Sequence, residues 1–217
     1  MSLNLRRISG LYAVTPDSEN LETLIASVEA ALLGGVCVVQ YRNKQANVNL
    51  RTHLETASAL AKLCRQHGVT FIINDYADLA LNVGADGVHQ GKDDGEIASA
   101  RKLLGKDAIV GVSCYNNLER ALQAQEQGAD YVAFGAMFPS STKPNAPRAT
   151  LELLRAAKAQ LHIPIVAIGG ITLHNATDVV DAGADALAVI NALFDAPDIQ
   201  KTAQQFSEFY LLNHDIT

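Results

Sequence analysis

The sequence contains no tryptophan and only three cysteines, Cys37, Cys64 and Cys114, with no C-x-x-C pair among its 217 residues. An odd number of cysteines without that spacing indicates neither a disulfide framework nor a zinc ribbon, and it is typical of a reducing compartment. Aromatic residues make up only 6% of the chain, whereas hydrophobic residues make up 48%. A core of small aliphatic side chains is what helices packed on a parallel sheet require.

Positive charge and long hydrophobic runs are scarce as well. Lysine and arginine number 17 against 23 acidic residues, which gives a net charge of -6. Such a chain has no basic field to attract a nucleic acid or an anionic membrane. The apolar stretch at residues 30–39 is broken by glycine and is too short to span a bilayer, and the first ten residues lack the apolar core of a signal peptide. We therefore expect a cytoplasmic protein that binds neither nucleic acid nor membrane.

Strand-like and helix-like patterns alternate along the whole chain. Strands are expected at 11–15, 36–41, 70–74, 87–89, 109–113, 131–135, 165–169 and 186–190, and helices at 21–33, 49–67, 77–83, 95–104, 118–127, 151–161, 173–182 and 199–212. The phrase Gly-Ala-Asp recurs at 84–86, 128–130 and 183–185, where glycine can end a helix before the next strand. Eight such units predict an α/β fold, a single-domain (β/α)8 TIM barrel over residues 1–217. An open Rossmann-like sheet is the alternative, but no G-x-G-x-x-G follows the first strand.

Two of these strands end on carboxylates. The strand that begins at Thr70 ends on Asn74-Asp75, and the next strand leads to Asp94. Active sites of this barrel lie at the carboxyl ends of the strands, so the two carboxylates can converge there. Carboxylates with few histidines nearby favour a hard cation such as Mg²⁺, which keeps waters and phosphate oxygens as its other ligands. The alternative is that each aspartate caps the helix that follows it.

Cationic and hydroxyl side chains occupy two other strand ends. The run Gln40-Tyr41-Arg42-Asn43-Lys44 leaves a buried strand, and alternation can give Gln40, Arg42 and Lys44 a common orientation. Beside a metal, these cations would form a clamp for a diphosphate. The segment 138–144 combines hydroxyls with Lys143 and resembles a mobile phosphate-binding loop. A solvated charged loop and an ordinary Ser/Pro-rich turn are the respective alternatives.

The last two strands indicate a second phosphate site. Gly169-Gly170 follows the seventh strand and Ile190-Asn191 the eighth, the position where such barrels often bind a phosphate through backbone N–H groups. One site with metal and one without suggest two phosphorylated substrates, or one substrate phosphorylated at both ends, with a metal-bound diphosphate as the leaving group. The strand ends show no evident pair of nucleophile and base. Cys114 reads as a small buried residue, and His89 as a packed histidine or one that supports a site residue.

Taken in order, these motifs resemble those of the thiamine phosphate synthase (thiamine-phosphate pyrophosphorylase) family over almost the whole chain. The resemblance rests on Gln40-Tyr41-Arg42-x-Lys44, Ile73-Asn74-Asp75, Ala85-Asp86-Gly87-Val88-His89 leading to Asp94, Gly111-Val112-Ser113, Phe138-Pro139-x-x-Thr142-Lys143 and Ala167-Ile168-Gly169-Gly170-Ile171. It implies a transferase that joins a pyrimidine diphosphate to a thiazole phosphate and forms thiamine phosphate. It also implies a dissociative mechanism, in which diphosphate leaves, a pyrimidine carbocation forms and the thiazole nitrogen captures it.

The resemblance also assigns residues. It implies that Mg²⁺ is bound by Asp75 and Asp94, and that Arg42, Lys44, Ser113 and Lys143 act in catalysis. The pyrimidine diphosphate would be bound by these four residues together with Gln40 and Asn74, in a strand end that also contributes Tyr41 and Asn43. The thiazole phosphate would be bound by Ser140, Ser141, Thr142, Gly170, Ile190 and Asn191.

Three residues depart from the family pattern: Asn191 stands where serine is usual, Lys92 where glutamine is common and Gln90 where an aliphatic residue is common. Backbone binding of the phosphate would tolerate Asn191. Two further functions remain open: a thiazole tautomerase-type barrel, which needs neither the metal pair nor the diphosphate clamp, and a non-catalytic sensor of a phosphorylated ligand. The sequence also leaves open whether the chain forms a homo-oligomer.

Overall fold

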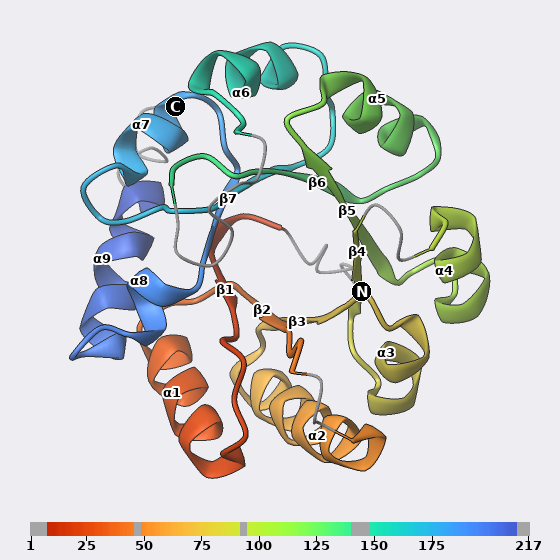
Figure 1. Ribbon diagram of the computed structural model, residues 1–217, viewed down its shortest axis with the longest axis vertical. Coiled ribbons are helices and arrows are strands. Elements are labelled where there is room, and N and C mark those ends of the chain that lie inside the picture. Colours follow the sequence, from red (N-terminus) through yellow and green to blue (C-terminus); the bar gives the residue numbers. More distant parts are fainter. Residues whose placement is uncertain (1–7, 46–48, 92–94, 140–147, 212–217) are drawn as a thin grey trace, which may run out of the picture.

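The computed structural model describes residues 8–45, 49–91, 95–139 and 148–211. Its strands form one closed parallel barrel in the order β1 to β8, surrounded by helices (Figure 1). The strands are β1 (Gly10–Val14), β2 (Val38–Tyr41), β3 (Thr70–Asn74), β4 (Gly87–Gln90), β5 (Ile109–Tyr115), β6 (Tyr131–Phe134), β7 (Ile165–Ile168) and β8 (Ala186–Val189). The predicted (β/α)8 barrel is confirmed, because β8 pairs with β1 and leaves no open edge.

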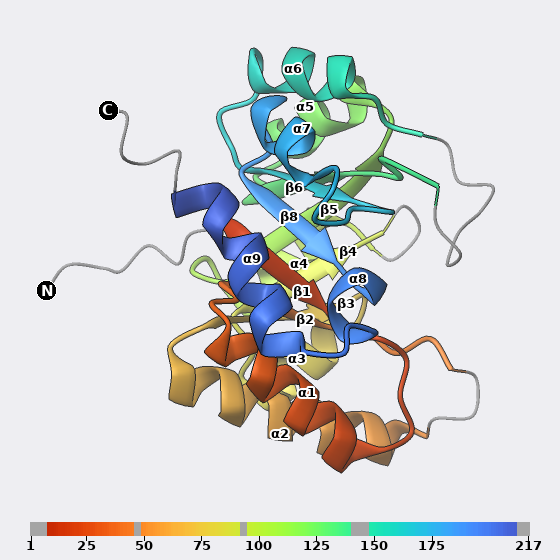
Figure 2. The ribbon, with the colours of Figure 1, turned by 90° about the vertical axis from the view of Figure 1, so that its left-hand side faces the viewer.

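The helices are α1 (Leu21–Leu33), α2 (Leu50–His67), α3 (Ala77–Val83), α4 (Ile97–Leu104), α5 (Leu118–Glu126), α6 (Leu151–Lys158), α7 (Ala176–Asp181), α8 (Asn191–Phe194) and α9 (Ile199–Leu211). Side chains of Asn20, Asn49, Asn117 and Thr150 accept the N–H three residues on and so start α1, α2, α5 and α6. The pattern did not predict the four-residue α8, which is too short to show a helical period. Helix α9 packs along α1 and β1 (Figure 2). No helix in the described ranges is long and apolar enough to cross a membrane.

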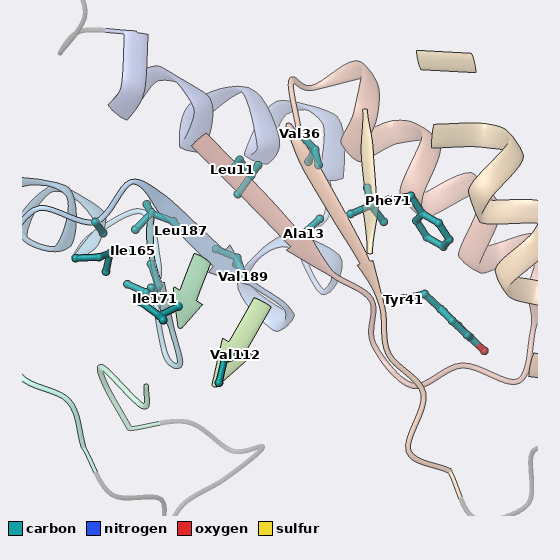
Figure 3. Close-up of a cluster of buried hydrophobic side chains, with 14 of the residues drawn as sticks. Leu11, Ala13, Val36, Tyr41, Phe71, Val112, Ile165, Ile171, Leu187 and Val189 are labelled. Atoms are coloured by element: carbon teal, nitrogen blue, oxygen red, sulfur yellow. The ribbon is translucent and has the colours of Figure 1, made fainter. Parts of the chain in front are cut away.

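Alternation along the strands separates two apolar layers. One set of side chains fills the barrel interior, among them Tyr12, Val38, Ile72, Tyr131 and Val166. The other set packs outward against the helices, and Figure 3 shows part of it, including Leu11, Phe71 and Leu187. Consequently, only every second residue at a strand end can face the barrel axis.

The repeated Gly-Ala-Asp phrase has a second role that the sequence did not reveal. Each of its aspartates pairs with a residue on the preceding strand, receiving an N–H in its carboxylate and donating its own N–H to the carbonyl of the same residue. The pairs are Asp86 with Phe71, Asp130 with Val110 and Asp185 with Ile165, and all six N···O distances lie between 2.7 and 2.9 Å. These aspartates therefore fix the strand register at the end of the barrel opposite the carboxyl ends of the strands.

Replacing Asp130 by alanine should lower the free energy of unfolding by about 2 kcal/mol, since the buried Val110 N–H would lose its charged acceptor and Arg101 its partner at 2.7 Å. Urea denaturation would measure this loss. Asp107→Ala is the control, because Asp107 is exposed in the loop that leads into β5, and its effect should stay within about 0.5 kcal/mol. Equal effects of the two changes would contradict the assigned role.

Candidate active site

The carboxyl ends of the strands surround a cavity of about 400 Å³. Its walls include seven of the residues predicted from the sequence, which come from five different strand ends: Gln40, Arg42, Asn74, Ser113, Gly170, Ile190 and Asn191. The barrel thus brings together residues as distant in sequence as Gln40 and Asn191. Most of the remaining lining is apolar, contributed by side chains such as Val14, Val166 and Ile168, so water is restricted at the cavity floor.

Two cations, each paired with a carboxylate, gather on one side of the cavity mouth. The backbone of Arg42 is held by Thr15, whose hydroxyl accepts the Arg42 N–H at 2.9 Å and donates to its carbonyl at 3.0 Å. The guanidinium contacts Asp17 at 3.1 Å, and Asp17 also accepts the Lys44 N–H at 2.9 Å. These contacts hold Arg42, which lines the cavity, and Lys44 close together at the end of β2, and the Arg42 side chain is only 19% exposed.

Asp75 lies beside these cations at the end of β3. Its carboxylate is 2.5 Å from the Lys44 ammonium and its side chain is 9% exposed. Asp75 has a φ of 66°, an uncommon value for a residue with a side chain, and its N–H donates to the His89 carbonyl on β4 at 2.8 Å. The first residue before α3 is Tyr76, and no side-chain hydrogen bond caps that helix. The carboxylate of Asp75 therefore faces the cationic rim and does not serve as a helix cap.

Asp75 is a suitable partial ligand for a hard cation. Within the described ranges, no group of three or more His, Cys, Asp or Glu residues gathers, as an all-protein metal cage would require. Mg²⁺ commonly takes one or two carboxylates and fills its remaining positions with water and phosphate oxygens, which fits a single carboxylate beside an anion site. Asp94, the second predicted ligand, lies outside the described residues, as does the neighbouring departure Lys92.

Glycine shapes the opposite side of the cavity. Gly170 has a φ of 66°, and a Cβ placed on it would come within 2.6 Å of the Pro139 carbonyl. The Gly170 carbonyl accepts the Asn175 side-chain amide at 3.1 Å, which fixes the turn after β7. Next to it, α8 begins at Asn191, and the first N–H groups of a helix have no acceptor within the helix. Backbone amides at such a terminus are suited to an anion.

A buried chain of polar side chains crosses the cavity floor, and the sequence analysis missed most of it. Tyr12 and Tyr131 face inward from β1 and β6, and their hydroxyls lie 2.8 Å apart. Gln40 Nε2 donates to the Tyr12 hydroxyl at 2.7 Å, and His89 Nδ1 is 2.9 Å from the Tyr131 hydroxyl. Burial raises the pKa of both tyrosines above the usual value, so both remain protonated.

The hydrogen-bonded chain of polar side chains ends at Ser113. The contact between His89 and Ser113 corrects one expectation from the sequence. His89 Nε2 lies 2.8 Å from Ser113 Oγ, which is the spacing of a nucleophile and its base. The sequence suggested that no such pair exists, because 24 residues separate the two side chains and only strand pairing joins them. Cys114, in contrast, is buried on the helix side of the barrel, and desolvation raises the pKa of its thiol to about 12. This agrees with the sequence, which indicated a small buried residue.

Several predicted residues lie elsewhere. Tyr41 points outward into the layer between strands and helices, where its hydroxyl is 3.2 Å from His53 Nδ1 (Figure 3). Asn43 is buried and its amide donates to the Ser18 carbonyl at 3.1 Å, so it braces the loop. Gln90 is buried, and its Oε1 has no hydrogen-bond partner among the described residues. The predicted loop residues Ser140, Ser141, Thr142 and Lys143 fall outside the described residues.

The sequence and the fold of this chain match those of known proteins. The model of one family, described as thiamine monophosphate synthase, matches residues 11–193. The chain belongs to the thiamine monophosphate synthase family. The membership expected from the sequence motifs is thereby confirmed, together with the transferase class that it implies.

Individual members of the thiamine monophosphate synthase family agree along nearly the whole chain. A thiamine-phosphate synthase of Nitrosospira multiformis is 52% identical over 94% of this chain and 87% of its own length. One from Methylobacillus flagellatus is 53% identical over 95% and 98%. The solved structure of a thiamine phosphate pyrophosphorylase from Pyrococcus furiosus superposes with a TM-score of 0.86 at 36% identity and covers 99% of this chain and all of that one.

Proposed function

We propose that this protein is a Mg²⁺-dependent thiamine phosphate synthase. It would transfer the hydroxymethylpyrimidine group from its diphosphate to the ring nitrogen of a thiazole phosphate and release diphosphate. The observation that carries the proposal is a cavity with Arg42 on one side, next to the Lys44–Asp75 ion pair, and with glycine and a helix terminus on the other side. The family description and the names of the relatives state this activity. The three free cysteines are consistent with the reducing cytoplasm.

The cationic rim is proposed to bind the diphosphate. Arg42 offers a planar fork of N–H donors that suits phosphate oxygens, and Lys44 offers a point charge. Both are held before substrate arrives, because Thr15 and Asp17 fix the backbone of the segment. Donors fixed in advance stabilise the charge that grows on a leaving group without reorganising. Lys143 and Ser113 are proposed to add donors, and Asn74 to contact the pyrimidine group.

Asp75, with Asp94, is proposed to hold Mg²⁺. The Asp75 carboxylate is nearly buried and is paired with Lys44. If the diphosphate and Mg²⁺ bind together, Lys44 can turn to the diphosphate while Mg²⁺ replaces it beside Asp75, so the carboxylate is never left unpaired. When bound, Mg²⁺ would neutralise negative charge on the diphosphate. The residues of the chain would position both groups.

The glycine side is proposed to bind the thiazole phosphate through Gly170 and the amides of Ile190 and Asn191, with Ser140, Ser141 and Thr142 from the neighbouring loop. Backbone donors explain why asparagine can stand at residue 191: its side chain donates to Asp195 at 2.7 Å and serves the turn of α8. The loop after β6 reaches this side at Pro139, which lines the cavity.

Gly170→Ala should raise the KM for the thiazole phosphate by about ten- to a hundredfold, since a methyl group would collide with the Pro139 carbonyl and displace the phosphate-binding turn. Steady-state kinetics with each substrate varied would measure it. Gly68→Ala is a matched control: Gly68 has a φ of 68°, nearly the same backbone conformation, but open space around its Cβ position. It tests the strain alone, and a similar rise in KM there would contradict the steric argument.

A dissociative reaction suits this set of residues. Departure of the diphosphate would form a pyrimidine carbocation, and the thiazole nitrogen, held on the other side, would capture it. The chain then needs donors for the leaving group and apolar walls that exclude water, and it has both. No covalent intermediate with the protein is required, so we assign Ser113 to hydrogen bonding.

The proposal is tested by incubating the protein with both phosphorylated precursors, with Mg²⁺ or with EDTA, and separating the products by chromatography. Thiamine phosphate and diphosphate should form in equal amounts with Mg²⁺ only. Isomerised thiazole phosphate without coupling would favour the tautomerase alternative. Binding without any turnover would favour a sensor.

A further inference from the structure

The polar chain on the cavity floor has a property beyond its contacts: it must have a direction. Five side chains from five strands join in the order Gln40, Tyr12, Tyr131, His89 and Ser113, through contacts of 2.7, 2.8, 2.9 and 2.8 Å. Each tyrosine carries one hydroxyl proton, and a neutral imidazole carries one N–H and one acceptor nitrogen. If every link is to hold one proton, all the hydrogen bonds must run the same way along the chain.

Only two arrangements satisfy this condition. In the first, Gln40 Nε2 donates to Tyr12, Tyr12 to Tyr131, and Tyr131 to His89 Nδ1, so that His89 Nε2–H donates to Ser113. The Ser113 hydroxyl proton then remains for the cavity, and Gln40 presents Oε1. In the second arrangement every bond is reversed. Gln40 then presents its NH₂ group to the cavity, and Ser113 donates its proton to His89 Nε2, so toward the cavity it can only accept a hydrogen bond.

The structure places the donating nitrogen of Gln40 on the Tyr12 hydroxyl, which starts the first arrangement. A positively charged His89 does not fit the first arrangement, because Nδ1 would then donate to Tyr131 and the Tyr131 hydroxyl would donate to Tyr12. Tyr12 would in turn need an acceptor at Gln40, whereas the structure places the donating Nε2 there. Burial raises the pKa of both tyrosines, so neither link loses its proton by ionising.

We propose that Tyr12, Tyr131 and His89 are positioning residues that fix this direction, so that Gln40 presents an acceptor and Ser113 a donor to the substrate. The inference rests on the proposed function and extends it. The pyrimidine substrate that the family resemblance implies carries an amino group, whose N–H₂ needs an acceptor, and Gln40 Oε1 supplies one. The diphosphate is an anion and needs donors, which Ser113 supplies. The reversed chain would turn the wrong group toward each part of the substrate.

The same direction decides how the contact between His89 and Ser113 functions. If Nε2 carries the proton, His89 cannot remove a proton from Ser113, and Ser113 is not an activated nucleophile. Ser113 is then a hydrogen-bond donor throughout the reaction. The tautomer of His89 therefore distinguishes a binding serine from a catalytic one.

The barrel leaves room for the central link of this chain. A Cβ on Gly111 would lie 2.0 Å from the Tyr131 ring and 2.4 Å from its hydroxyl, so the ring occupies the space of a missing side chain on β5. The ring also stacks on the His89 imidazole, with centroids 5.5 Å apart. These contacts fix the hydroxyl of Tyr131 between Tyr12 and His89.

The test is the tautomer of His89, measured by ¹⁵N NMR on the ligand-free protein at neutral pH. The chain has six histidines, and loss of one signal set in His89→Gln assigns the spectrum. We expect the Nε2–H tautomer, with a pyrrole-type Nε2 and an unprotonated Nδ1. An Nδ1–H tautomer or a doubly protonated ring would overturn the proposal. This measurement needs no turnover, so it fails separately from the proposed activity.

A variant at the far end of the chain tests the coupling. A carboxylate in Gln40→Glu can only accept from Tyr12, so the bonds from Tyr12 to His89 should reverse and His89 Nδ1, three links away, should gain a proton. An Nδ1 that stays unprotonated in this variant, when its thermal unfolding shows a folded protein, would contradict the coupling.

Kinetics of Tyr131→Phe supply a second readout that does not depend on that variant. Loss of the central hydroxyl should raise the KM for the pyrimidine diphosphate about tenfold, the value of one hydrogen bond, and leave the KM for the thiazole phosphate unchanged. Tyr210→Phe, which removes a hydroxyl 3.5 Å from the Ala184 carbonyl far from the cavity, is the control and should change neither. Equal changes in both KM values would mean that Tyr131 only supports the fold.

Discussion

Asp75→Asn is expected to lower kcat/KM by about 10²- to 10³-fold at fixed Mg²⁺, because the amide keeps the shape of the carboxylate but removes the charge that holds the cation. The Mg²⁺ concentration for half-maximal activity should rise as well. Stability should change by less than about 1 kcal/mol, since the lost partner, Lys44, is 47% exposed and can be solvated. Steady-state assays over a Mg²⁺ titration, with thermal unfolding in parallel, would measure all three.

Asp78→Asn is the control for this change. Asp78 is exposed in the first turn of α3, three residues from Asp75. The substitution Asp78→Asn therefore removes the same charge outside the cavity. Its kcat/KM should stay within about twofold of the unchanged protein, which corresponds to a typical surface substitution. If Asp78→Asn and Asp75→Asn behave alike, the metal assignment of Asp75 is wrong.

Arg42→Ala is expected to reduce kcat/KM by a similar factor, about 10²- to 10³-fold, through loss of a preorganised donor fork in a site where water is restricted. The effect should fall on the KM for the pyrimidine diphosphate and on kcat, but not on the KM for the thiazole phosphate, which binds on the opposite side. Stopped and continuous assays with each substrate varied would separate these parameters.

Arg51→Ala provides the comparison for lost positive charge. Arg51 is 85% exposed on α2, pairs with Glu55 at 2.7 Å and does not line the cavity. Its removal should leave both KM values unchanged. A rise in both KM values on Arg42→Ala would instead indicate that Arg42 supports the loop as a whole.

The barrel could be predicted because its signal is repeated. Apolar runs recur eight times with helical patterns between them, and the fold places active-site residues at strand ends whatever their spacing in sequence. Gln40, Asn74 and Gly170 could therefore be assigned to one cavity without knowledge of their distances. The helix-ending role of glycine in Gly-Ala-Asp was also readable, because Gly84 adopts the left-handed conformation after α3.

Other features could not be predicted, because they depend on contacts across the barrel. The hydroxyls of Tyr12 and Tyr131 meet although 119 residues separate them, and no local pattern marks that pair. Strand parity would have helped: Gln40 faces inward, so its neighbour Tyr41 must face outward. Applied to β6 and β4, the same rule would have placed Tyr131 and His89 at the cavity floor.

The most direct test is a crystal structure of the protein with thiazole phosphate, diphosphate and Mg²⁺ bound together. The account predicts both anions in one cavity, with the diphosphate and the metal against Arg42, Lys44 and Asp75 and the monophosphate against Gly170 and the start of α8. Well-ordered anions in exchanged positions, with the monophosphate against Arg42 and the diphosphate against Gly170, would contradict the account. A metal distant from Asp75 would contradict it as well.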